Sequence, residues 1–282
     1  MNIKDQLYDI TRKRGSKHFL EGILSRITTD YDLVKFVHRY SVFNGDFAGG
    51  VANLAGAYHV RRDLFRDSNI DVPDCADRAS EIASHIYFAA EDEYFDRANP
   101  HVRITHRQFG QILLAYTLRY YGISSQEFAA THALNPHTQA TLAKVVEGYC
   151  VNRRNDEVDI LRGLGFHLGS ELLADEEFNI IDRFLRSRYP ELVEYLEESE
   201  TVFGKNAYLW VQLHTVVETE HFDFAITAAE KTIEYYSGEL SKEEVRQHII
   251  DGFIGFADLQ QAFFSNILED ASVAGLSARA AA

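Results

Sequence analysis

The sequence predicts an all-α protein, and three observations support this fold class. Nearly every long segment repeats its apolar residues with the period of a helix. Convincing strand alternation of apolar and polar residues is absent, and turn-forming residues fall between the periodic segments rather than within them. We expect helices over residues 2–14, 17–27, 30–66, 75–96, 103–121, 124–131, 138–149, 155–187, 190–198, 202–237 and 241–268.

Proline, glycine and capping residues set the predicted helix boundaries. Ser241 with Glu244 three positions later is a capping box, which predicts the start of the last long helix. A glycine-rich run over 44–50 does not follow a strand, so we reject a phosphate-binding loop and expect a kink or close helix contact there. The predicted breaks are Asn69 to Pro73, Asn99-Pro100, Asn135-Pro136, Tyr189-Pro190 and Ser237-Gly238.

The 282 residues are expected to form one domain. The chain is long enough to bury a sizeable core, and it contains no linker-like stretch rich in proline, glycine or serine. We therefore predict a single helical domain over residues 1–270, built as a bundle around long helices. Residues 271–282 are small and polar, which is typical of a frayed C-terminal tail.

Composition limits the partners and the compartment. A formal net charge of −15 argues against binding to nucleic acid or to an anionic membrane surface. Cys75 and Cys150 show neither zinc-site spacing nor a disulfide framework, which favours a reducing compartment. Met1 is followed by a polar segment, and no apolar run approaches the length of a membrane span. We expect a soluble cytoplasmic protein.

One late helix carries the clearest functional motif. His214, Glu218 and His221 stand at positions i, i+4 and i+7, which places them within roughly 60° of one another on a helix. Trp210 and other apolar residues share that face, so it points inward. A buried carboxylate is costly unless it is paired or bound to a cation, and two imidazoles with one carboxylate suit iron and its neighbours. The alternative is a pair of partly buried histidines satisfied by hydrogen bonds.

The helix over 75–96 offers a second inward carboxylate. Glu93 shares an apolar stripe with the core-facing residues of this helix. Glu81, His85 and Asp92 form a rival stripe, which we interpret as a solvated face because two of its members stand beside charged residues.

Two further helices place polar side chains on apolar faces. Glu171 lies in the middle of an apolar stripe; it is predicted to be a metal ligand, or otherwise an internal partner of His167 or of an arginine. His106 shares its face with Phe109, whereas His101 in the preceding turn competes for the same role. We favour His106 because the helix that follows it aligns better.

Three carboxylates and three imidazoles thus occupy the inward faces of four predicted helices. This donor set suits two iron ions with open coordination positions, an arrangement that activates dioxygen. The predicted ligands are Glu93, His106, Glu171, His214, Glu218 and His221.

Over residues 35–265 the chain resembles the haem-oxygenase-like di-iron oxidases and oxygenases. Ala90-Glu-Asp-Glu-Tyr94 with Thr105-His-Arg-Gln-Phe109 looks like the family's early carboxylate and histidine. Gly165-Phe-His-Leu-Gly-Ser-Glu171 looks like its middle helix, and His214 to His221 like its late motif. The chain departs from the family pattern at Glu218, where aspartate is usual, and in the longer gap between its early carboxylate and histidine.

The resemblance implies a haem-oxygenase-like helical bundle with about seven core helices preceded by N-terminal helices. It also implies two iron ions per chain, cycling between Fe(II) and Fe(III), with dioxygen as co-substrate. Family members commonly oxidise amino acids, amines or fatty acids by N-oxygenation, desaturation or carbon–carbon cleavage, and a homodimer is the habit of the fold.

Four alternatives stay open at this level. A cofactorless or thiaminase-like enzyme of the same fold would rely on a cysteine or on polar pocket residues, but neither cysteine lies in a supporting motif. Haem oxygenase itself would need a proximal histidine such as His38 or His59. A ferritin-like centre would need a second copy of the motif Glu218-x-x-His221. A non-enzymatic helical metal-binding or interaction protein is the fourth.

Overall fold

The computed structural model confirms the all-α fold class. It describes residues 2–65, 77–94, 104–131, 134–151 and 156–269, with the backbone alone at 130–131, 175 and 216–219. Within these ranges the only strand-like pairing is an isolated bridge between Glu200 and Asn206. The helices are α1 (Ile3–Arg14), α2 (Ser16–Leu24), α3 (Asp30–Phe43), the 3₁₀ turn η1 (Asn44–Asp46), α4 (Phe47–Val60), α5 (Arg78–Tyr94), α6 (His106–Tyr120), α7 (Ser125–Thr131), α8 (Pro136–Gly148), α9 (Glu157–Arg188), α10 (Pro190–Glu198), α11 (Leu209–Tyr235) and α12 (Lys242–Asn266).

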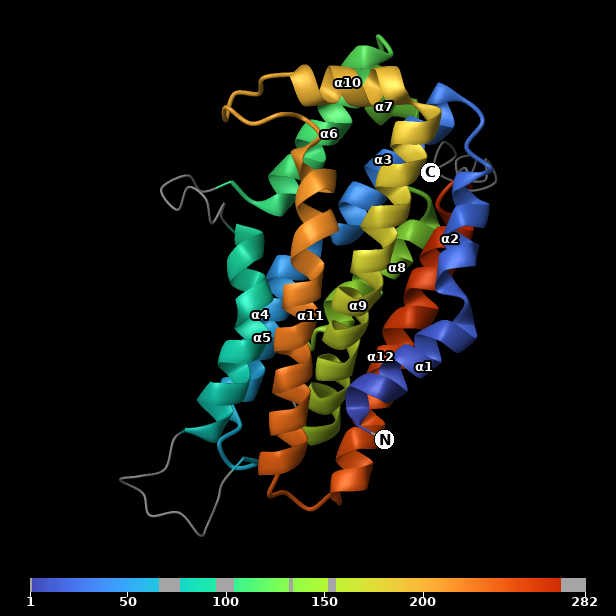
Figure 1. Ribbon diagram of the computed structural model, residues 1–282. Helices are drawn as coiled ribbons and strands as arrows, with labels where there is room; N and C mark the ends of the chain where they lie inside the picture. Colours follow the sequence, from blue (N-terminus) through green and yellow to red (C-terminus); the bar gives the residue numbers. More distant parts are fainter. Residues whose placement is uncertain (1, 66–76, 95–103, 132–133, 152–155, 270–282) are drawn as a thin grey trace, which may run out of the picture.

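The long helix α9 runs through the middle of the bundle. It packs along α11 on one side and α12 on the other, and α5 packs between α4 and α11 (Figure 1). Helices α1 and α2 cover the flank formed by α9 and α12, and α10 crosses one end of the bundle (Figure 1). Most of the interior is one apolar cluster to which nearly every helix contributes, and Val34, Leu118 and Phe128 form a small second cluster. No helix in the described ranges is both long and apolar enough to cross a membrane.

Glycines allow the backbones of α9 and α12 to touch. A Cβ atom at Gly165 would lie 1.7 Å from the carbonyl oxygen of Ile249, and one at Gly252 would lie 1.9 Å from that of Arg162. Any larger residue at either position would force the two helices apart, because backbone atoms cannot turn away as a side chain can. This crossing therefore fixes α9 against its neighbour.

Two predicted helices were wrong in extent. The segment 30–66 is divided into α3 and α4 by η1, and α4 ends at Val60. At this break the Asn44 amide donates to the Tyr40 carbonyl, and the Arg107 guanidinium donates to the Gly45 carbonyl. The segment 202–237 is helical only from Leu209, because a turn with the left-handed Gly204 precedes it. The break at η1 confirms the kink expected in the glycine-rich run 44–50.

Buried cations of α3 cap the C-terminal end of α12. Arg39 is 1% exposed and donates to the carbonyl oxygens of Ile267 and Glu269 at 2.5 and 2.7 Å. Lys35 donates to the Leu268 carbonyl at 3.2 Å. These bonds satisfy carbonyl groups of the residues directly after the helix, and the positive charges oppose the negative end of the helix dipole. The predicted tail 271–282 lies outside the described residues.

Candidate metal centre

A small cavity in the bundle brings predicted ligands from four helices together. Its volume is about 20 Å³, which is room for one or two water molecules. Five of the six predicted ligands line it: Glu93, His106, Glu171, His214 and His221. The side chain of Glu218 and all of His101 lie outside the described residues. The remaining walls are Ser41, Asn44, Phe47, Val51, Ala89, Arg107, Ser170, Ala174 and Trp210.

Glu93, His106 and His214 form the tighter part of the centre. Oε1 of Glu93 lies 2.9 Å from Nδ1 of His106 and 3.5 Å from Nε2 of His214. One ligand atom from each of the three residues lies within 4.8 Å of the other two, and no other group of three in the described residues does so. Two imidazoles and one carboxylate converging on one point are a ligand set typical of non-haem iron.

Local structure fixes both histidines of this group. His106 is the first residue of α6, whose start is set by a capping box between Thr105 and Gln108. Nδ1 of His214 donates to the carbonyl of Trp210 at 2.7 Å, so Nε2 is the nitrogen that faces Glu93. The ring of Phe178 stacks on the His214 imidazole at 4.2 Å and restricts its rotation. A metal ligand whose other nitrogen is held in this way is oriented before the metal arrives.

A second group surrounds His221. Nδ1 of this imidazole lies 3.3 Å from Glu171 Oε2, and Nε2 lies 3.0 Å from Asp92 Oδ2. A carboxylate can only accept, so the hydrogen bond to Asp92 places a proton on Nε2 and leaves Nδ1 facing Glu171. On the far side of Glu171, Oε1 lies 3.2 Å from Nδ1 of the fully buried His167. Glu171 is therefore both a lining residue of the cavity and a neighbour of His167, as each of its two predicted roles required.

Asp92 corrects the sequence analysis. Its stripe was expected to be a solvated face, yet the residue is only 5% exposed and contacts His221. Adjacent residues of a helix are 100° apart, and α5 packs between α4 and α11. The buried sector of α5 is consequently wide enough to hold both Asp92 and Glu93. Sequence periodicity alone assigned only one of them to the interior.

The ionisation of the centre follows from its contacts. Burial raises the pKa of Glu93, but the imidazoles of His106 and His214 outweigh it and hold that pKa well below its usual range. Burial likewise opposes the effect of His167 and His221 on Glu171, whose pKa falls to about 2. Burial lowers the pKa of His106, and the Glu93 charge more than reverses this and raises it. Both glutamates are thus ionised at neutral pH.

These residues fit a bound transition metal. Ionised carboxylates in the interior require compensating positive charge, and a proton on His106, whose pKa the Glu93 charge raises, supplies it beside Glu93. A metal ion binds by displacing such protons, and the imidazole nitrogens and carboxylate oxygens already face one another around the cavity. The donor types suit iron or a similar first-row ion rather than calcium or magnesium.

The histidines considered for a haem ligand lie elsewhere. The ring of His38 lies 5.1 Å from that of Phe128, between centroids, in a groove between α3, α6 and α7. His59 faces Ser80, with its Nδ1 2.9 Å from the hydroxyl, at an exposed position between α4 and α5. Neither lines the cavity that holds the other histidines.

Comparison with known proteins supports the fold. No family model and no curated protein matches the chain. Among solved structures, the chain is similar to a CADD-like protein of unknown function from Nostoc punctiforme. The TM-score is 0.61 at 14% sequence identity, and the match covers 95% of this chain and 96% of the other. The two proteins share an all-helical fold along nearly their whole length.

Proposed function

We propose that this protein is a non-haem di-iron oxidase or oxygenase that uses dioxygen to oxidise a small molecule. The observation that carries the proposal is the convergence of Glu93, His106 and His214 on one point of a buried cavity. A purely structural cluster of charged groups would be costly at this position, whereas bound metal would stabilise it. The resemblance of the sequence to haem-oxygenase-like di-iron enzymes supports the same assignment.

We assign the candidate ligands to two proposed metal positions. Glu93, His106 and His214 would hold the first ion. Glu171 and His221 would hold the second, together with Glu218 of the late motif. Bound iron would supply the binding and reduction of dioxygen, which the side chains of the protein cannot perform.

The residues of the chain orient these ligands and keep the centre dry. The carbonyl of Trp210 holds the His214 tautomer, and Asp92 holds His221 with Nδ1 toward Glu171. Phe47, Val51 and Ala174 supply apolar walls, which limit the access of water to the centre. For the substrate we propose an amino acid, an amine or a fatty acid, oxidised by N-oxygenation, desaturation or carbon–carbon cleavage.

An anaerobic titration with Fe(II) tests the proposal. Trp210 is the single tryptophan of the chain, and its ring lies 5.7 Å from that of His214. Iron bound at His214 should therefore quench tryptophan fluorescence, with saturation at two equivalents per chain. The His214→Ala variant should lose the quenching. His18 lies on α2 with its side chain 86% exposed, so His18→Ala should retain it.

Reaction with dioxygen is the second part of this test. Rapid mixing of the Fe(II) protein with dioxygen should consume it and produce a transient visible absorption that His214→Ala lacks. Weak iron binding, or binding that is equal in His214→Ala and His18→Ala, would refute the proposal.

A further inference from the structure

Trp210 connects the candidate metal centre to a buried tyrosine. Its indole ring lies 5.7 Å from the His214 imidazole and 5.7 Å from the phenol ring of Tyr40, measured between centroids. Trp210 and Tyr40 are 3% and 2% exposed. Tryptophan and tyrosine are among the side chains most readily oxidised by one electron, and rings in such proximity exchange electrons efficiently. His214, Trp210 and Tyr40 therefore form a short path along which an electron can move between the candidate metal centre and the tyrosine.

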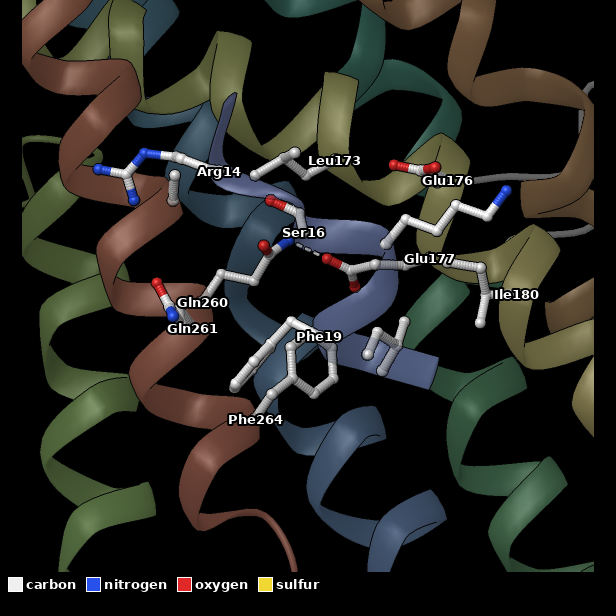
Figure 2. A pocket seen from close by; sticks show the side chains of 13 residues that line it. Arg14, Ser16, Phe19, Leu173, Glu176, Glu177, Ile180, Gln260, Gln261 and Phe264 are labelled. Atoms are coloured by element: carbon white, nitrogen blue, oxygen red, sulfur yellow. Dashed lines mark hydrogen bonds between the residues drawn. The ribbon is translucent and has the colours of Figure 1, made fainter. Parts of the chain in front are cut away.

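The hydroxyl of Tyr40 has a proton acceptor in place. It donates to Oε2 of Glu177 at 3.0 Å, and Gln260 donates to the other carboxylate oxygen (Figure 2). A phenol that loses an electron becomes a strong acid, so its oxidation requires a base within hydrogen-bond distance. Glu177 is only 7% exposed, and a carboxylate at this position is more costly than an apolar side chain would be. Packing of the interior alone does not account for a carboxylate at this position.

Glu177 also faces a pocket on the flank of the bundle. This pocket lies between α2, α9 and α12, and Figure 2 shows Glu177 and Gln260 side by side in its wall. Phe264, which stacks near Tyr40 with centroids 6.1 Å apart, lines the same pocket. Arg14 and Lys17 line it as well. A proton taken up by Glu177 thus has a route to solvent that does not pass through the metal centre.

We propose that Trp210, Tyr40 and Glu177 form a proton-coupled electron relay between the cavity and this pocket. An oxidised Trp210 takes one electron from Tyr40, and the phenolic proton passes to Glu177. The products are the neutral indole, a neutral tyrosyl radical and a protonated carboxyl group. A one-electron reductant of the thiol or enediol class in solution then restores the phenol, with the proton returned from Glu177. The use of the relay in turnover rests on the proposed function, whereas the relay itself does not require metal.

Tyr208 is the natural comparison for Tyr40. It is buried and donates its hydroxyl to Asp182 at 2.9 Å, so it is also a phenol paired with a carboxylate. It is the N-cap residue of α11, and the two positions between it and Trp210 correspond to a turn of about 200° around the helix. Contact with the indole, rather than a carboxylate partner alone, distinguishes Tyr40.

Flash photolysis of the metal-free protein tests the relay. A flash at the long-wavelength edge, where indole alone absorbs, ejects one electron from Trp210 to a scavenger in solution. In the unmodified protein the indole radical should decay as a tyrosyl absorption grows. Tyr40→Phe should abolish that growth and prolong the indole radical, whereas Tyr208→Phe should change neither.

Glu177→Gln separates the proton acceptor from the ring path. Glutamine still accepts a hydrogen bond from Tyr40 but takes up no proton, so the tyrosyl signal should be lost while the indole radical still forms. Far-ultraviolet circular dichroism and Trp210 emission verify that each variant is folded, and Glu177→Gln carries the test if Tyr40→Phe does not fold. An indole lifetime unaffected by both variants, or a tyrosyl signal lost in Tyr208→Phe, would overturn the relay and leave the iron titration unchanged.

Discussion

Asp92 Oδ2 lies 3.0 Å from Nε2 of His221, and this contact joins α5 to α11 behind the candidate metal centre. The imidazole consequently directs Nδ1 toward Glu171, which lines the cavity. Carboxylates in this position fix the tautomer of a metal-binding histidine and increase its basicity. The contact makes His221 dependent on a residue that sequence periodicity placed on the surface.

Replacement of Asp92 by asparagine should weaken one metal position and spare the other. Asp92→Asn removes the negative charge behind His221, so the affinity of the Glu171 and His221 position should fall about 10- to 100-fold. The position formed by Glu93 and the α6 histidine should be unchanged. Calorimetric titration with Co(II) measures the two affinities separately. Glu91→Gln, on the exposed neighbour of Asp92, is the matched control, and equal losses in both variants would contradict the prediction.

The choice between His106 and His101 is tested by substituting each. Nδ1 of His106 lies 2.9 Å from Glu93, so His106→Ala should abolish binding at the first metal position. His101→Ala should bind both ions with normal affinity. The quenching of Trp210 by Fe(II) reports on each variant. Loss of the first ion in His101→Ala alone would transfer the ligand role to that residue.

Helical periodicity was sufficient to select five residues that the structure brings to one cavity, and its failures have causes in tertiary packing. It selected these residues because each lies on an apolar stripe of a long helix. It missed Asp92 because α5 is covered on two sides, which widens its buried sector. The glycine-rich run 44–50 predicted a kink but not that η1 would divide the helix expected over 30–66. At this break Arg107 donates to the Gly45 carbonyl, between residues 62 apart in sequence, and such a contact has no signature in the residues around Gly45.

The glycine contact between α9 and α12 should be intolerant of a single methyl group. A Cβ atom at Gly165 would overlap the Ile249 carbonyl at 1.7 Å, so Gly165→Ala should destabilise the protein by about 3 kcal/mol or more. Gly56 on α4 has open space around the same position, and Gly56→Ala should stabilise by about 0.5–1 kcal/mol. Urea denaturation measures both free energies of unfolding. Equal stability of the two variants would contradict close backbone packing at this crossing.

The capping box of α3 should give a stability contribution that is lost in acid. Slight burial raises the pKa of Asp32, and the hydrogen bonds from Thr29 and from the Thr28 and Thr29 amides outweigh it and lower that pKa below its ordinary 3.8. A lowered folded-state pKa stabilises above the unfolded value and ceases to do so as the pH falls through the folded value.

Asp32→Ala measures this contribution. Because the side chain is only partly buried and is screened by solvent, the variant should lose only about 0.5 kcal/mol at neutral pH. The difference from the unmodified protein should shrink as the pH falls below 3.8, where the carboxylate becomes protonated. Urea denaturation at pH values above and below this range tests the sign, and a difference that grew in acid would contradict the assignment.

Arg39 should contribute more to stability than any exposed ion pair of the protein. Arg39→Met keeps an apolar stem of similar length but leaves the carbonyls of Ile267 and Glu269 without their charged donor, at a cost of about 2–4 kcal/mol. Arg12 is the comparison, because its side chain is 78% exposed and pairs with Asp9 on the surface. Arg12→Met should change stability by less than about 1 kcal/mol. Urea denaturation measures both. Since Tyr40 follows Arg39 directly on α3, loosening of this end of the helix should also shift the emission of Trp210. An Arg39→Met protein as stable as Arg12→Met would mean that the α12 terminus is held by packing rather than by the buried charge.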